Sequence, residues 1–132
     1  MKGPNVILEK SFEFAIEIVK FTSKIAKEKQ EYVITKQLLK SGTSIGANVS
    51  EAAFAQSKLD FIHKLSIGLK EANESRYWLN LLKQTNYMNI IEFENLMTLN
   101  NDILYLLTKS IKTAKENLRT SNLAKKNNLP KT

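Results

Sequence analysis

The chain has 132 residues, close to the commonest size for one domain and enough to bury a single core without disulfides or metals. Its 42% hydrophobic and 25% charged residues exclude an intrinsically disordered chain. The absence of cysteine excludes a disulfide framework, a thiolate zinc site and a cysteine nucleophile. The net charge is +7, which is a reason to ask where the positive charge lies.

The first predicted helix runs roughly from Val6 to Lys27 and carries two apolar stripes at helical spacing. The first stripe consists of Phe12, Ala15, Ile16 and Val19. The second consists of Phe14, Ile18, Phe21 and Ile25. Two stripes make an unusually wide apolar face, so we expect this helix to have two neighbours.

The second predicted helix runs roughly from Glu31 to Ala55. Gly42 and Gly46 lie inside its apolar line, where they weaken the helix locally. The surrounding residues are mostly serine and alanine, which leave little side chain between two backbones. We therefore expect this stretch to be a contact surface for another helix.

Two N-cap patterns predict the starts of the remaining helices. Ser57 is followed three residues later by Asp60, and Asn89 is followed by Glu92. Apolar residues then repeat at helical spacing to about residue 119. We expect one four-helix domain over residues 1–120 and a basic, disordered tail over residues 121–132, where too few apolar residues remain to pack.

Short connections between helices of similar length predict the fold class. Proline occurs only at positions 4 and 130, and strand-like alternation is absent. The chain is therefore expected to be all-α, an antiparallel up-down-up-down four-helix bundle. The start of the sequence lacks the apolar stretch of a signal peptide, and no apolar run approaches the ~20 residues of a membrane span. We expect a cytoplasmic protein without a membrane partner.

The positive charge is concentrated at the end of the chain. From Lys109 onward there are seven basic residues and one acidic residue, a net of +6, whereas residues 1–108 hold 13 basic and 12 acidic side chains. Such an end often marks an arm that binds phosphates, and it is equally typical of a solvated terminus that aids solubility. The candidate nucleic-acid contacts are Lys109, Lys112, Lys115, Arg119, Lys125 and Lys126.

A polar network between the second and third helices is a further expectation. Asn48 and Glu51 share a face of the second helix and could meet acidic and basic groups of the third. Such a network would fix register or partner choice. Its predicted members are Ser44, Asn48, Glu51, Glu71, Glu74 and Arg76.

The motifs of common active sites are missing from the sequence. His63 is the only histidine, so a bundle-core di-iron site cannot be built. Gly42 and Gly46 lack the Lys-Ser or Lys-Thr of a phosphate-binding loop. An enzyme would need a metal at Glu51, Glu71 and Glu74, and two exposed or lysine-paired carboxylates are the simpler interpretation. We expect no enzyme activity, no metal and no cofactor.

A long linear pattern resembles a known family. It includes the stretch Gln37-Leu38-Leu39-Lys40-Ser41-Gly42-Thr43-Ser44-Ile45-Gly46-Ala47-Asn48-Val49-Ser50-Glu51-Ala52. It continues through residues 57–62 and 70–79 and begins at residues 10–15. These residues resemble the signature of the four-helix-bundle protein family, also called the 23S rRNA-intervening-sequence protein family. The fourth helix matches mainly in length and periodicity, and the basic tail lies outside the shared motif.

The resemblance implies a left-handed antiparallel bundle that assembles into a ring-like homo-oligomer, usually a pentamer, without enzymatic activity. Some family members are encoded inside intervening sequences of bacterial 23S rRNA genes. A more distant relative, the accessory protein of diversity-generating retroelements, is similarly basic and pentameric and binds nucleic acid and a reverse transcriptase. The two stripes of the first predicted helix agree with oligomerisation, because one stripe can serve the core and the other a neighbouring subunit.

Two functions follow as hypotheses. The first is an oligomeric RNA- or DNA-binding protein whose basic arms act on phosphates and not on base edges. The second is a scaffold that holds a protein partner, with the tail serving solubility alone. The aromatic residues Tyr77, Trp78, Tyr87 and Tyr105 are not interleaved with the basic cluster, so the sequence predicts no stacking platform for bases.

Overall fold

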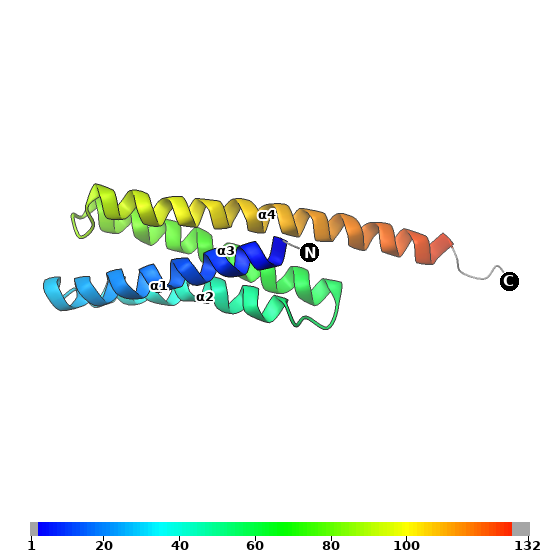
Figure 1. Cartoon of the computed structure of the whole chain (residues 1–132), viewed down its shortest axis with the longest axis horizontal. Coiled ribbons are helices and arrows are strands. Elements are labelled where there is room, and N and C mark those ends of the chain that lie inside the picture. The colour runs from blue at the N-terminus through cyan, green and yellow to red at the C-terminus, as the bar shows by residue number, and fades with distance from the viewer. Residues whose placement is uncertain (1–2, 128–132) are drawn as a thin grey trace.

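The computed structural model describes residues 3–127 and consists of four α-helices (Figure 1). They are α1 (Gly3–Lys29), α2 (Val33–Ala52), α3 (Lys58–Gln84) and α4 (Ile90–Asn127). No strand occurs within the described residues. The predicted all-α class with four helices is confirmed. Each helix begins within a few residues of its predicted start.

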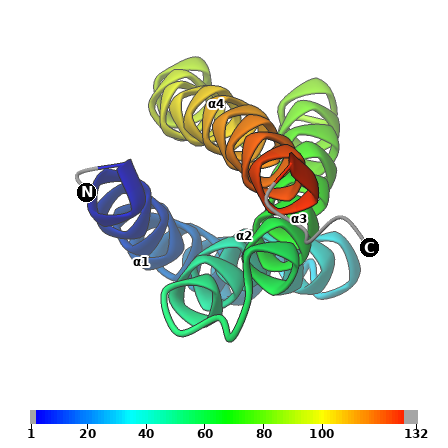
Figure 2. The same cartoon turned by 90° about the vertical axis from the view of Figure 1, so that its right-hand side faces the viewer.

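Each helix packs against the helices before and after it in the chain, and α1 also packs against α4. The chain reverses its direction at every connection, as the colour gradient in Figure 1 shows. Figure 2 looks along the helices and shows them surrounding a common axis. This packing is compatible with a bundle. Its left-handed twist and its assembly into a ring stay predictions.

The core is formed by one stripe from each helix. From α1 it takes the second of the two predicted stripes, because Phe14, Ile18, Phe21 and Ile25 are all buried. The other helices contribute mainly leucine and isoleucine. Their fully buried members include Leu38, Ile45, Leu65, Leu79, Leu82, Ile103 and Leu107.

The predicted caps start α3 and α4. The backbone N–H of Asp60 donates to Ser57 Oγ at 3.0 Å. Asn89 and Glu92 form a reciprocal capping box, because the Glu92 N–H donates to Asn89 Oδ1 at 2.8 Å and the Asn89 N–H donates to Glu92 Oε1 at 3.0 Å. Both caps satisfy backbone donors that the first turn of a helix leaves without partners.

A glutamate caps α2, which the sequence pattern did not predict. Glu31 Oε2 accepts hydrogen bonds from the backbone N–H groups of Val33 and Ile34, and Oε1 accepts one from Thr35 at 2.8 Å. Partial burial alone would raise the pKa of Glu31, but these backbone hydrogen bonds favour the carboxylate and hold its pKa below the ordinary value.

The small-residue stretch of α2 is a contact surface within the chain, against α1. A Cβ atom placed on Gly42 would lie 3.0 Å from both Cγ1 and Cγ2 of Ile18. A Cβ on Gly46 would meet the backbone oxygen of Ser11 at the ordinary distance of 3.5 Å. An alanine at position 42 would therefore require the buried Ile18 side chain to move by a few tenths of an ångström.

Two buried polar contacts join the helices at the interior. Ser75 Oγ of α3 donates to Ser41 Oγ of α2 at 2.9 Å. Asn100 Nδ2 of α4 donates to the backbone oxygen of Ala72 in α3 at 3.0 Å. Asn100 is fully buried, and its Oδ1 atom has no hydrogen-bond partner among the described residues. Asn100 thus links α3 and α4 at one level of the bundle.

The last helix is longer than the apolar pattern predicts. Helix was expected to about residue 119, followed by a disordered tail over 121–132, but α4 continues to Asn127. Residues 121–127 are therefore helical, and residues 128–132 lie outside the described part of the chain. The reason is that α4 contains no glycine or proline, so helical backbone continues after the apolar residues thin out. Figure 1 shows α4 running past the ends of the other three helices.

The close approach at Gly42 generates a stability prediction. Gly42→Ala gains up to about 1 kcal/mol of helix propensity but forces its Cβ against Ile18, an overpacking cost of about 1–3 kcal/mol. We expect a net loss of about 1 kcal/mol, measured by urea unfolding. Gly46→Ala is the matched control, because its Cβ fits at 3.5 Å and the variant should be neutral or more stable. Equal effects at the two positions would contradict the tight contact.

The Glu31 cap generates a pH prediction. Because the folded pKa of Glu31 is depressed, its stabilisation is fully present above the unfolded pKa of about 4.3 and is lost as the pH falls through the folded value. Glu31→Ala should lower the free energy of unfolding by about 1 kcal/mol at pH 7. The difference from the wild type should shrink below pH 4 in a series of urea titrations. A constant difference from pH 7 to pH 3 would show that the charged carboxylate is not the cap.

Candidate nucleic-acid interface

Four of the six candidate cations share one face of α4. Lys112, Lys115, Arg119 and Lys126 are spaced by 3, 4 and 7 residues, which brings them into one row along a helix. We call this row the basic face. It spans 14 residues, or about 21 Å at 1.5 Å per residue. The other two cations, Lys109 and Lys125, lie on either side of the row.

All six cations are exposed and available to a ligand. Within residues 3–127, none of them forms an ion pair with a carboxylate. The stems of Lys115, Arg119 and Lys126 line a shallow hollow together with Leu118 and Leu123. Lysine and arginine have apolar stems and charged ends, so together with the leucines they offer both apolar and cationic surface to a ligand.

The structure brings Tyr105 to this row, which the sequence pattern missed. Tyr105 lies seven residues before Lys112 and is 65% exposed. Lys109 Nζ lies 6.0 Å from the centroid of its ring, a cation–π contact. In the sequence Tyr105 precedes the basic cluster and is not interleaved with it, so the linear order alone does not place the ring beside the cations. The seven-residue spacing, two helical turns, was the signal that would have found it.

The predicted members of the polar network on α2 do not pair with those on α3 within the described residues. Asn48 donates to the backbone oxygen of Ser44, and Glu51 pairs with Lys64 of α3 at 3.4 Å. Glu74 accepts a hydrogen bond from Trp78 Nε1 in its own helix, and Arg76 is exposed. Within the part of the chain that the structure describes, no hydrogen bond or ion pair connects Ser44, Asn48 or Glu51 with Glu71, Glu74 or Arg76.

The sizes of the side chains differ between the buried contact of α2 with α3 and its exposed surroundings. The buried contact between these helices is made by Ser41 and Ser75, which are short enough to meet inside the core. The longer acidic and amide side chains are half-buried or exposed, so water competes for their hydrogen bonds. Partial burial, and then the neighbouring carboxylate of Glu74, raise the pKa of Glu71.

The carboxylates considered for a metal are not brought together. Among residues 3–127, no group of three or more histidine, aspartate or glutamate side chains is placed to hold a metal ion. Glu51 is engaged with Lys64, as described above.

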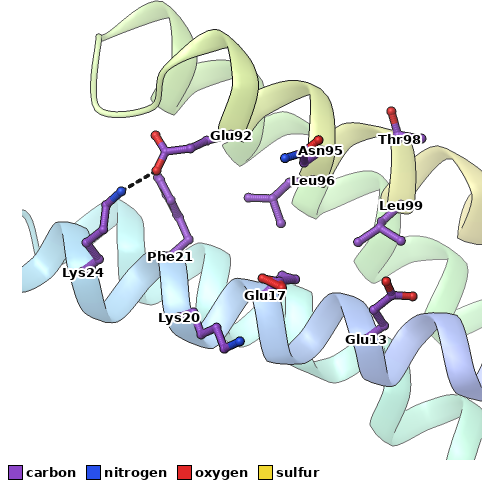
Figure 3. A pocket seen from close by; sticks show the side chains of 10 residues that line it. All are labelled: Glu13, Glu17, Lys20, Phe21, Lys24, Glu92, Asn95, Leu96, Thr98 and Leu99. Carbon is purple, nitrogen blue, oxygen red and sulfur yellow. Dashed lines mark hydrogen bonds and ion pairs between the residues drawn. The ribbon is translucent and has the colours of Figure 1, made fainter.

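A second surface feature is a groove between α1 and α4 (Figure 3). Its volume is about 550 Å³. Phe21, Leu96 and Leu99 provide its apolar part, while side chains of both charge signs lie around them. Charged groups of both signs give the groove no preference for a polyanion, in contrast with the basic face.

An ion pair closes one end of the groove. Lys24 Nζ donates to Glu92 Oε2 at 2.6 Å, as the dashed line in Figure 3 shows. The hydrogen bond to Glu92 raises the pKa of Lys24. Burial alone would raise the pKa of Glu92, but the contacts with Lys24 and the Asn89 N–H lower it. Glu92 thus links α1 to α4 while it caps α4.

The first predicted stripe of α1 faces away from the core. Phe12 is 67% exposed, Ile16 40% and Val19 45%. We call these three residues the outer stripe. They follow one another at intervals of four and three residues, so they form a continuous apolar line on a single helix. Within the described chain this line has no covering element.

The comparison with family models identifies the chain. The model of the 23S rRNA-intervening sequence protein family matches residues 4–109. The chain belongs to this family. It is also similar to a crystal structure of a protein of unknown function from the S23 ribosomal protein family of Bacteroides thetaiotaomicron VPI-5482. The two are 48% identical with a TM-score of 0.82, and the match covers 83% of this chain and 98% of the other. No protein with a curated description matches the chain.

These findings separate the bundle from the basic face. The family match ends at residue 109, so Lys112, Lys115, Arg119, Lys125 and Lys126 all follow it. Neither the family description nor the similar structure carries an enzyme name, and nothing in them points to catalysis. In the described residues, no helix combines the length and apolarity needed to cross a membrane.

Proposed function

We propose that the protein is a cytoplasmic, non-enzymatic homo-oligomer that binds RNA or DNA by its phosphates through the basic face of α4. The observation that carries this proposal is the row Lys112, Lys115, Arg119 and Lys126, four exposed and unpaired cations on one side of a helix that runs past the rest of the fold. Lys109 and Lys125 add charge beside it.

The geometry of the row suits a phosphate backbone. Successive cations are separated by about 4.5, 6 and 10.5 Å along the helix axis, and a straight helix can follow a strand over this distance. Lysine and arginine that neutralise phosphates release counterions, which supplies affinity without reading sequence. Glu116 lies beside the row, four residues after Lys112 and three before Arg119, and it is the one acidic residue among residues 109–127, so the net charge of this segment stays positive.

Assembly of several chains would strengthen this weak arm. The outer stripe of α1 supports oligomerisation, because three exposed apolar side chains in a line are a typical subunit contact. We infer that it is covered by a second copy of the chain, in the left-handed bundle and ring of five that the family resemblance implies. Five arms on one particle would multiply the affinity for a long polyanion through effective concentration.

A protein-interaction scaffold is the second candidate, and the outer stripe also favours it. If Phe12, Ile16 and Val19 hold a different protein, substitutions there abolish binding of that partner while the basic face is irrelevant. The two candidate functions therefore differ in the surface where substitutions abolish binding: the basic face for a nucleic acid and the outer stripe for a protein partner.

The nucleic-acid proposal predicts a steep salt dependence. Binding of the wild type to mixed-sequence RNA and DNA, measured by fluorescence anisotropy from 50 to 300 mM salt, should weaken linearly on a log–log plot. The triple variant Lys112→Gln, Lys115→Gln, Arg119→Gln should reduce the slope by roughly 2–3 and the affinity at 100 mM salt by about tenfold or more.

The matched control removes the same amount of charge elsewhere. Lys27 and Lys29 in the last turn of α1 and Lys36 of α2 are exposed, and none of them forms an ion pair within residues 3–127. Changing all three to glutamine should leave the slope nearly unchanged. Equal losses in both triple variants would reduce the effect to net charge, and absence of binding by the wild type at 50 mM salt would overturn the proposed function.

The oligomer proposal predicts a mass change. Light scattering of the wild type should give several times the 15.1 kDa chain mass. Phe12→Ser with Ile16→Ser should shift the particle toward the monomer, because each lost apolar contact costs about 1.5–3 kcal/mol. Leu59→Ser is the control, since Leu59 is equally exposed at 67% but lies on α3. A monomeric wild type would contradict the proposal.

A further inference from the structure

Tyr105 and Thr108 extend the basic face toward the start of α4. Tyr105, Thr108, Lys112, Lys115 and Arg119 are separated by intervals of three or four residues and are all exposed. The row thus begins with an aromatic ring and continues with cations. From Tyr105 to Lys126 it spans 21 residues, about 32 Å along the helix.

The environment of Tyr105 presents its ring to a ligand. The side chain is 65% exposed, so most of the ring surface is in water. Lys109 lies one turn further along, with its amino group 6.0 Å from the ring centroid. A base that stacks on the ring would therefore have a cation beside it for its own phosphate. Tyr77 of α3 is similarly exposed at 60%, but its ring packs edge to face against Trp78, with the ring centroids 4.9 Å apart.

We propose that the nucleic acid bound by this protein is single-stranded and that Tyr105 stacks on one of its unpaired bases. This inference rests on the proposed function and names its substrate class. In a duplex both faces of an internal base are covered by its neighbours, so the Tyr105 ring has no base face to reach. An unpaired base offers a π-face of any sequence, and its stacking on an aromatic side chain adds to the phosphate contacts.

The test compares strands and substitutions. Full-length wild type, Tyr105→Leu and Tyr105→Phe are titrated with labelled single-stranded RNA and DNA of mixed sequence, with the matched duplexes, and with a single strand of abasic sites. Tyr105→Leu should weaken binding to both normal single strands about five- to 150-fold. Its affinity for duplexes and for the abasic strand should change less than about twofold, with the salt slope unchanged.

Two further variants exclude indirect effects. Tyr105→Phe keeps the ring and should retain wild-type affinity. Tyr77→Leu removes a similarly exposed aromatic residue from α3 and should have no effect. Circular dichroism and the thermal midpoint show that each variant keeps the fold, as expected for a side chain that is mostly in water.

The outcomes separate this inference from the proposed function. If the wild type binds with the expected salt slope but Tyr105→Leu binds single strands equally well, the stacking role is overturned and the phosphate-binding function stands. Equal losses on single strands and duplexes would also overturn it, because stacking on an unpaired base cannot act on a duplex. If the wild type binds no nucleic acid at 50 mM salt, both proposals fall together.

Discussion

The surface of this protein depends on α4 being one uninterrupted helix. Its start is fixed by the Asn89–Glu92 capping box and by the Lys24–Glu92 ion pair to α1. Buried side chains from Leu96 to Ile111 then set its rotation about its own axis. Because the backbone continues as a helix to Asn127, the direction of every later side chain follows from that rotation. The core thus determines which way the basic face points, although the core does not touch most of it.

A polar group in an apolar stripe connects α4 with α3. Asn100 is fully buried, donates to the backbone oxygen of Ala72, and leaves its Oδ1 atom without a partner among the described residues. A buried acceptor in this state costs stability, and an apolar side chain of similar size would avoid the cost. The hydrogen bond to Ala72 is made only at the present level of the two helices, so a shift between them would leave the Asn100 amide without this partner. A slip of one turn would move the end of α4 by about 5.4 Å, so this contact also sets how far the basic face lies from the bundle.

Much of the fold follows from local sequence patterns, and the misses share a physical cause. Helical periodicity and the Ser57 and Asn89 caps located α3 and α4 because these signals act between residues three or four apart. The Glu31 cap was missed because a glutamate reaches the first turn from outside the usual N-cap residues. The predicted contact of Glu51 with Glu71 is absent among the described residues, where Glu51 pairs with Lys64 and the buried contact between α2 and α3 is made by Ser41 and Ser75. The cations of the candidate site are evident from the distribution of charge along the sequence. The position of Tyr105 beside them follows only when one continuous helix is known to contain both Tyr105 and the cations.

The charged end of α4 has an energetic consequence for binding. Ala114 and Leu118 of α4 still pack against the core, and the segment that continues from there to Asn127 would be marginal as an isolated helix in water. Lys112 with Lys115 and Lys115 with Arg119 are like-charge neighbours at helical spacing, which lowers helix stability further, while Lys125 and Lys126 in the last turn interact favourably with the helix dipole. Phosphates bound along the row would remove the repulsion between neighbouring cations. On the proposed function, binding and helix stability are therefore coupled: a polyanion stabilises the same helical end that presents the cations to it, and salt weakens binding while it relieves the repulsion in the free arm.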